Sequence, residues 1–133
     1  MIDIENAVFT EVATALRASF PGITVESVTT YSPSKFPCVC IEETDNYSLL
    51  STRDTASNEN HATVVYEVNV YSNKAKGKKT EAKAILAAVD SVLNGLGFTR
   101  TTKTPINLDD ATKYRVFARY RAVVSTNKTI YRR

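Results

Sequence analysis

The first 19 residues have the hydrophobic spacing of an amphipathic helix. Apolar side chains recur at every fourth position, and they are Ile4, Val8, Val12 and Leu16. This spacing places them on one helical face, because residues three or four apart are neighbours there. Asp3 is a suitable N-cap, and Pro21 with Gly22 ends the element. The pattern therefore predicts a helix over 3–19.

A second helix is predicted from Thr80, which can cap it, to about Asn94. Its apolar stripe is wide and consists of Ala82, Ile85, Leu86, Val89, Leu93 and Leu96. Gly95 and Gly97 stand where helices commonly close in a left-handed conformation. A stripe of this width indicates a helix that covers a hydrophobic core.

Shorter runs alternate apolar and polar residues, as half-buried strands do. The predicted strands are 23–29, 37–42, 64–71, 98–103 and 114–124, and the tail after 126 can add a short edge strand. Within 114–124, Arg115, Arg119 and Arg121 share one face, since alternate residues of a strand point to the same side. The sheet is therefore expected to have one arginine-rich face.

Helices and strands in this order predict an α+β fold. Two amphipathic helices pack on one face of a mostly antiparallel, mixed sheet of about five strands, which gives a two-layer sandwich. A length of 133 residues is that of a single domain, and we expect 1–133 to form it. No apolar run approaches the ~18 residues of a membrane span, and the acidic N-terminus lacks a signal peptide's basic segment. We expect synthesis in the cytoplasm and no membrane partner.

Residues 44–62 are polar and have no regular pattern, which predicts a long flexible loop. It contains the apolar pair Leu49 and Leu50, followed by Arg53. Such a segment fits a binding arm that becomes ordered on contact. A small local cluster or a hairpin extension explains the same residues equally well.

Charge is distributed unevenly along the chain. The net charge is −6 over 1–60 and +7 over 100–133, against +3 for the whole chain. The basic end suits an acidic partner, either nucleic acid or the acidic end of a neighbouring copy, unless the charges interleave in the fold. We expect a subunit or partner interface that includes Glu42, Glu43, Asp45, Leu49, Leu50, Arg53, Arg115, Arg119 and Arg121.

The sequence contains no recognisable catalytic constellation. His61 is the single histidine, and no nucleophile elbow or glycine-rich phosphate loop is present. Cys38 and Cys40 fall on one strand face, and we expect them to be small buried hydrophobes. Together with the one histidine they would still need carboxylates from elsewhere to complete a four-ligand zinc site. We expect no catalytic residue, no metal site and no cofactor, and therefore no enzyme.

Five segments resemble the small tail-completion or tail-terminator proteins of tailed bacteriophages and phage-derived tail particles. They are FPCVCIEETDN (36–46), ENHATVVYEVNVYSNKAKGKKTEAK (59–83), LGFTRT (96–101), YRVFARYRAVV (114–124) and the final IYRR. The resemblance extends over most of the chain after residue 35, whereas residues 1–35 match only in pattern. The order of elements also resembles that of the lambda-type tail terminator.

The resemblance implies a structural virion protein. Such proteins form a homo-oligomeric, hexameric ring that caps the head-proximal end of the tail tube, stops tail polymerisation and provides the head-joining surface. The implied partners are further copies of the chain, the tail tube protein, the head–tail connector proteins and, as a further candidate, the sheath protein. DNA would only pass through the lumen, and the chain would reside in the virion tail.

Two alternatives stay open on the sequence. One is a head-closure or neck adaptor protein, which differs in the partner that it caps. The other is a small nucleic-acid-binding domain, because Arg115, Phe117, Arg119 and Arg121 on one strand face resemble a platform for stacking and phosphate contact. The aromatic signature of RNA-binding sheets is missing, which weakens this alternative.

Overall fold

The chain folds into two helices and six strands in this computed structural model, which describes residues 1–30, 33–48, 61–125, 127–128 and 130–131. The helices are α1 (Glu5–Ser19) and α2 (Lys78–Leu96). The strands are β1 (Thr24–Glu26), β2 (Cys38–Ser48), β3 (His61–Ser72), β4 (Thr99–Ile106), β5 (Tyr114–Ser125) and β6 (Ile130–Tyr131). The predicted α+β class is confirmed, and the tail does add a short strand.

All six strands belong to one sheet, and the order of the first five is β1-β2-β3-β5-β4. β6 pairs with Val123 and Val124 of β5, past the end of the pairing between β4 and β5. The sheet is mixed, as predicted, and it has six strands where about five were expected, because the tail adds β6. β1 runs parallel to β2, while the other neighbours are antiparallel. A parallel pair needs a crossover connection. In the segment that follows β1, Thr29 donates a 3.0 Å hydrogen bond to Glu42 of β2.

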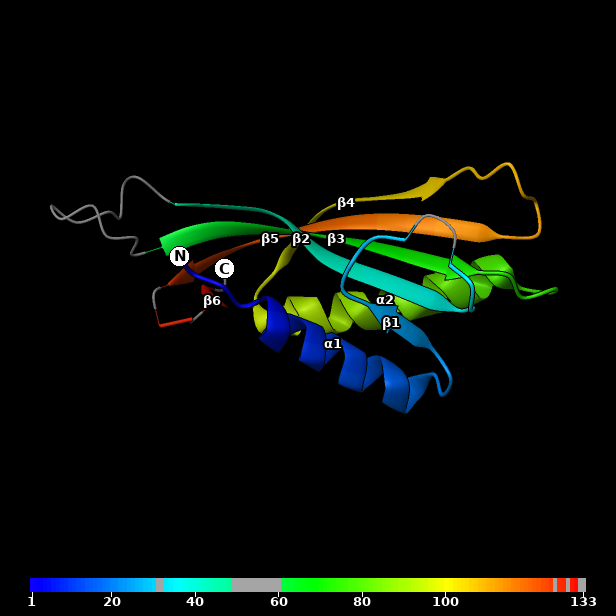
Figure 1. Ribbon diagram of the computed structural model, residues 1–133, viewed down its shortest axis with the longest axis horizontal. Helices are drawn as coiled ribbons and strands as arrows, with labels where there is room; N and C mark the ends of the chain where they lie inside the picture. Colours follow the sequence, from blue (N-terminus) through cyan, green and yellow to red (C-terminus); the bar gives the residue numbers. More distant parts are fainter. Residues whose placement is uncertain (31–32, 49–60, 126, 129, 132–133) are drawn as a thin grey trace, which may run out of the picture.

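Both helices lie on the same side of the sheet (Figure 1). Their apolar stripes meet the strands in one core cluster, in which Val12, Leu16, Ile85 and Leu93 pack with the even-numbered residues of β3 and β5. Tyr66 and Phe98 contact edge to face, with ring centroids 5.2 Å apart. This side of the sheet is therefore covered, and only the opposite side remains for contacts made by the sheet.

The helix ends differ from the predictions by a few residues. α1 starts at Glu5, and Asp3 accepts the Glu5 backbone N–H at 3.0 Å although Ile4 occupies the N-cap position. α2 starts two residues before Thr80, because Gly77 adopts the left-handed conformation (φ 85°) that begins the helix. Gly97 (φ 109°) closes α2 as the glycine pattern indicated.

The predicted loop over 44–62 is wrong at both ends. β2 continues to Ser48 and β3 begins at His61, and the two strands pair from Asp45 with Val65 to Ser48 with Ala62. Backbone pairing to an apolar strand thus extends β2 through polar residues that lack any alternation. The remaining residues 49–60 lie outside the described residues.

Candidate interface on the uncovered sheet face

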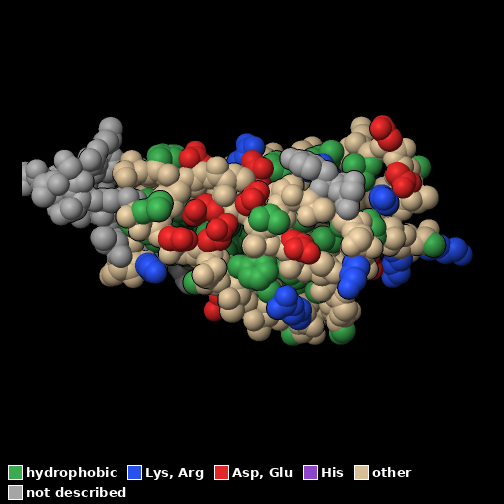
Figure 2. All heavy atoms as spheres, viewed as in Figure 1, with side chains coloured by type: hydrophobic (Ala, Val, Ile, Leu, Met, Phe, Trp, Pro, Cys, Tyr) green, Lys and Arg blue, Asp and Glu red, His purple; other side chains and the backbone are tan. Residues whose placement is uncertain are grey.

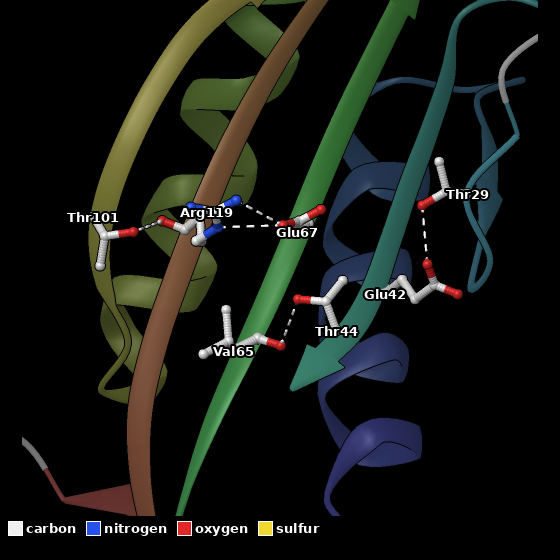
Figure 3. A network of polar contacts seen from close by, with 7 residues as sticks. All are labelled: Thr29, Glu42, Thr44, Val65, Glu67, Thr101 and Arg119. Carbon is white, nitrogen blue, oxygen red and sulfur yellow. Dashed lines mark hydrogen bonds and ion pairs between the residues drawn. The ribbon is translucent and has the colours of Figure 1, made fainter. Parts of the chain in front are cut away.

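The sheet side opposite the helices carries the odd-numbered residues of β3 and β5, and we refer to it as the open face. Register places Glu42, Glu67, Arg119 and Thr102 in one row across β2, β3, β5 and β4. Figure 3 shows this region, where polar contacts link adjacent strands. The arginine-rich face predicted from the alternation of β5 is therefore this open face.

Arg119 is bound to a neighbour within the sheet. Its Nε and Nη2 both donate to Glu67 Oε2, at 3.2 and 2.9 Å (Figure 3). Its guanidinium also lies 5.5 Å from the ring centroid of Phe117. The cross-strand pairing of Glu67 with Arg119 explains this contact, since directly opposed residues have neighbouring side chains. Arg119 therefore has an intramolecular role before any partner binds.

Arg115 is likewise held in place. Its Nε donates to Asn69 Oδ1 at 2.9 Å, and its guanidinium lies 5.3 Å from the Tyr71 ring centroid. Tyr71 packs with Cys38, Cys40 and the partly buried Phe36 in a second apolar cluster on this face.

Both cysteines are buried there, as expected for small hydrophobes. The hydrogen bond with Cys40 and then burial raise the pKa of the Cys38 thiol. This thiol therefore stays protonated, and it packs in the second apolar cluster with Tyr71 and Phe36.

Arg121 differs from the other two arginines. It is exposed, and in the described part of the chain no acidic side chain lies within ion-pair distance of it. Its neighbours in the same row are Val65 on β3 and Thr99 on β4. Of the three predicted arginines, Arg121 is the one whose guanidinium is available to a partner.

The three predicted acidic residues separate in the structure. Glu42 and Asp45 belong to the open face, where Glu42 accepts a 3.0 Å hydrogen bond from Thr29 Oγ1. Glu43 lies on the helix side, because it pairs with Tyr66 before a register shift between Glu43 and Asp45. Leu49, Leu50 and Arg53, also predicted for the interface, lie outside the described residues.

Glu43 contacts the start of α1, a neighbour that its place in the sequence does not indicate. Its backbone N–H donates to Glu5 Oε2 at 3.0 Å. Burial, followed by the negative charge of Glu5, raises the pKa of the Glu43 carboxyl, and Asp3 contributes in the same direction. The spacing of Asp3 and Glu5 indicated only a helix start, and nothing in it specifies which strand lies beside that start.

The described residues contain no group of three or more His, Cys, Asp or Glu side chains arranged to hold a metal ion. Among the same residues, no helix has the length and apolar character required to cross a bilayer.

Comparison with known proteins gives a likeness in fold. No protein-family model and no curated protein matches the sequence. A chain from a solved structure described as the virion of a native gene transfer agent (GTA) particle is similar in fold, with a TM-score of 0.69. The two sequences are 21% identical, and the match covers 92% of this chain and 94% of that chain. At this identity the likeness shows that the two chains share a fold.

Proposed function

We propose that this chain is a structural protein of a phage or phage-like virion. The observation that carries the proposal is the likeness to a chain of a gene transfer agent virion, which spans nearly the full length of both chains. A match of that extent concerns the complete arrangement of helices and strands rather than one common motif. In this proposal the chain has no catalytic role.

Within the virion, we propose the role of a tail terminator. Copies of the chain form a hexameric ring that caps the head-proximal end of the tail tube, stops its polymerisation and offers a surface to the head. The resemblance of five sequence segments supports this role. A ring also needs a heterologous contact between two different surfaces of each subunit, and a small domain with acidic and basic regions suits such a contact.

The β4 edge of the sheet favours contacts through side chains rather than through added strands. β4 is an edge strand, and it carries a register shift between Arg100 and Thr102, a lysine at 103 and a proline at 105. Bulges, lysine and proline are features with which proteins keep edge strands from pairing with other chains. At this edge, subunits of the proposed ring therefore make contact through side chains rather than through an added strand.

Tube polymerisation in vitro tests the proposed function. Purified tube protein from the same genome would be polymerised with and without this chain, and tube lengths measured by electron microscopy. The proposal predicts shorter tubes with a ring at one end. Unchanged lengths, together with binding to portal–adaptor complexes, would instead identify a neck adaptor. Binding to DNA that weakens steeply with salt would support a nucleic-acid-binding domain.

A further inference from the structure

One end of the molecule carries a concentration of lysine side chains. Figure 2 shows several Lys and Arg side chains at the right-hand end, where β3 passes into α2 (Figure 1). We call this group the lysine tip, and its members are Lys74, Lys76, Lys78, Lys79 and Lys83. Four of them are exposed and Lys78 is half-buried. Between positions 74 and 83 five lysines stand against one glutamate, so the segment has a net charge of +4.

The acidic side chains at this end of the molecule are engaged with other groups. Glu81, the one acid within the segment, accepts a 2.7 Å hydrogen bond from Ser72 Oγ at the end of β3. In the turn between β4 and β5, Asp110 accepts the Thr112 backbone N–H at 2.9 Å and pairs with Lys113 at 3.6 Å. No ion pair joins the lysine tip to an acid in the part of the chain that the structure describes. The positive charge of the tip is therefore left for an anionic partner.

The composition of the tip indicates which kind of anion it suits. Interfaces between proteins are enriched in aromatic residues, methionine and arginine and are depleted in lysine. The lysine tip contains no arginine, and none of the exposed large hydrophobic residues of the described chain belongs to it. Lysine binds phosphate as a flexible point charge, without the fixed geometry that arginine brings to a protein contact. The tip therefore fits a phosphate backbone better than it fits a protein surface.

The arginines of the open face are less suited to the same partner. Arg115 donates to Asn69, and Arg119 donates twice to Glu67. Binding of phosphate there would have to compete with these contacts, and Arg121 alone has no acidic partner among the described residues. No lysine of the tip has such a contact to give up.

We propose that the lysine tip binds the phosphate backbone of double-stranded DNA without sequence preference. Double-stranded DNA carries one negative charge per about 1.7 Å of its axis, so several lysines can each meet a phosphate. Lys79 and Lys83 lie one helical turn apart on α2 and point to the same side. Lys74 and Lys76 extend the charged surface onto the turn before α2. The inference rests on the proposed virion role for the source of the DNA, whereas the contact itself needs only one subunit.

Two triple variants that remove the same charge test the contact. The first takes three exposed lysines from the tip and combines Lys76→Gln, Lys79→Gln and Lys83→Gln. The matched control takes three exposed basic residues from elsewhere and combines Arg17→Gln, Lys35→Gln and Lys128→Gln. All six side chains are exposed, so both variants should keep the thermal midpoint of the unmodified chain.

Fluorescence anisotropy with a labelled DNA duplex of mixed sequence measures the affinity over a series of salt concentrations. The logarithm of the binding constant should fall with the logarithm of salt concentration, with a slope of about 0.9 for each phosphate contacted. The tip variant should bind at least about tenfold more weakly at low salt, and its slope should be smaller by about 2–3. The control variant should bind nearly as tightly as the unmodified chain.

Several results would overturn the proposal. They are an unmodified chain that does not bind the duplex at low salt, equal weakening by the two triple variants, and weakening by Arg121→Gln but not by the tip variant. A tip variant that keeps its DNA affinity and fails to assemble would identify the tip as a protein contact instead.

Tube lengths measured in parallel separate this inference from the terminator role. The tip variant should still shorten tubes. DNA binding through the tip with tubes of unchanged length would support the contact and contradict the terminator role. Shortened tubes without DNA binding would support the terminator role and overturn the contact.

Discussion

Arg119 and Arg121 are two residues apart on the same strand face, yet the structure assigns them different roles. Arg119 donates twice to Glu67 and stacks near Phe117, whereas Arg121 has no acidic partner among the described residues. Truncation of Arg119 to alanine should therefore destabilise the subunit, and truncation of Arg121 should not. The comparison separates an arginine that supports the fold from one that is free for assembly.

The size of the effect follows from geometry and exposure. The side chains of Arg119 and Glu67 are 47% and 27% exposed, so water screens their attraction. Both donors also share a single oxygen, Oε2, instead of forming two parallel bonds. Exposed ion pairs contribute about 0.2–1 kcal/mol, and a solvent-exposed cation–π contact adds about 0.5–1 kcal/mol. Arg119→Ala is thus expected to cost about 1–1.5 kcal/mol, of which about 0.5–1 kcal/mol is coupling to Glu67.

A double-mutant cycle measures the coupling directly. Urea unfolding of wild type, Arg119→Ala, Glu67→Ala and the double variant gives the interaction free energy, with Arg121→Ala as the control that should change stability by no more than about 0.5 kcal/mol. High salt should reduce the coupling, because the pair is partly exposed. A coupling indistinguishable from zero at low salt, or an equal loss of stability for Arg121→Ala, would refute the assignment.

Three further predictions concern the stability of the subunit. Gly97→Ala should destabilise the subunit by about 1 kcal/mol, because the backbone φ of Gly97 is 109°. Gly95→Ala should stabilise it by up to about 1 kcal/mol, because Gly95 is helical and an added Cβ meets no atom within 4 Å. Thermal midpoints of the two variants that shift in the same direction would contradict this prediction. Burial and the charge of Glu5 raise the pKa of the Glu43 carboxyl, so the folded chain binds the carboxyl proton more tightly than the unfolded chain does. The folded state therefore loses stability as pH rises through the folded pKa and Glu43 ionises. Glu43→Gln should therefore raise the thermal midpoint more near pH 7 than near pH 4, and equal shifts at both would argue against the raised pKa. Tyr120→Phe removes a 2.7 Å hydrogen bond to Asp90 and should lower the free energy of unfolding by about 1 kcal/mol, measured by urea titration, with an unchanged value as the contrary result.

The central strands could be predicted from the sequence with their faces correct. In β5 and in the middle of β3, from Val64 to Val68, the buried residues recur at every second position, and burial of one face fixes that pattern. The second half of β2 could not be predicted, because Asp45 to Ser48 have no apolar alternation and are strand through pairing with β3. The parallel direction of β1 could not be predicted either, because the local sequence pattern does not specify which neighbour a strand pairs with.

The candidate site shows the same limit. Alternation placed Arg115, Arg119 and Arg121 on one face, as found. Two of these arginines have partners within the sheet, since Arg115 donates to Asn69 and Arg119 donates to Glu67. These partners lie about 50 residues away in the sequence and are brought alongside only by the register of the strands. Asp3 and Glu5 meet Glu43 because α1 starts beside β2, and no short-range signal carries that information.

Native mass spectrometry over a concentration series tests the central claim most directly. A chain that forms the proposed ring should show a hexamer that grows with concentration at the expense of the monomer. The intermediate species should be few, because ring closure adds a contact without adding a subunit. A stable dimer as the sole assembly would contradict the account, since an isologous pair uses up the complementary surfaces that a ring requires.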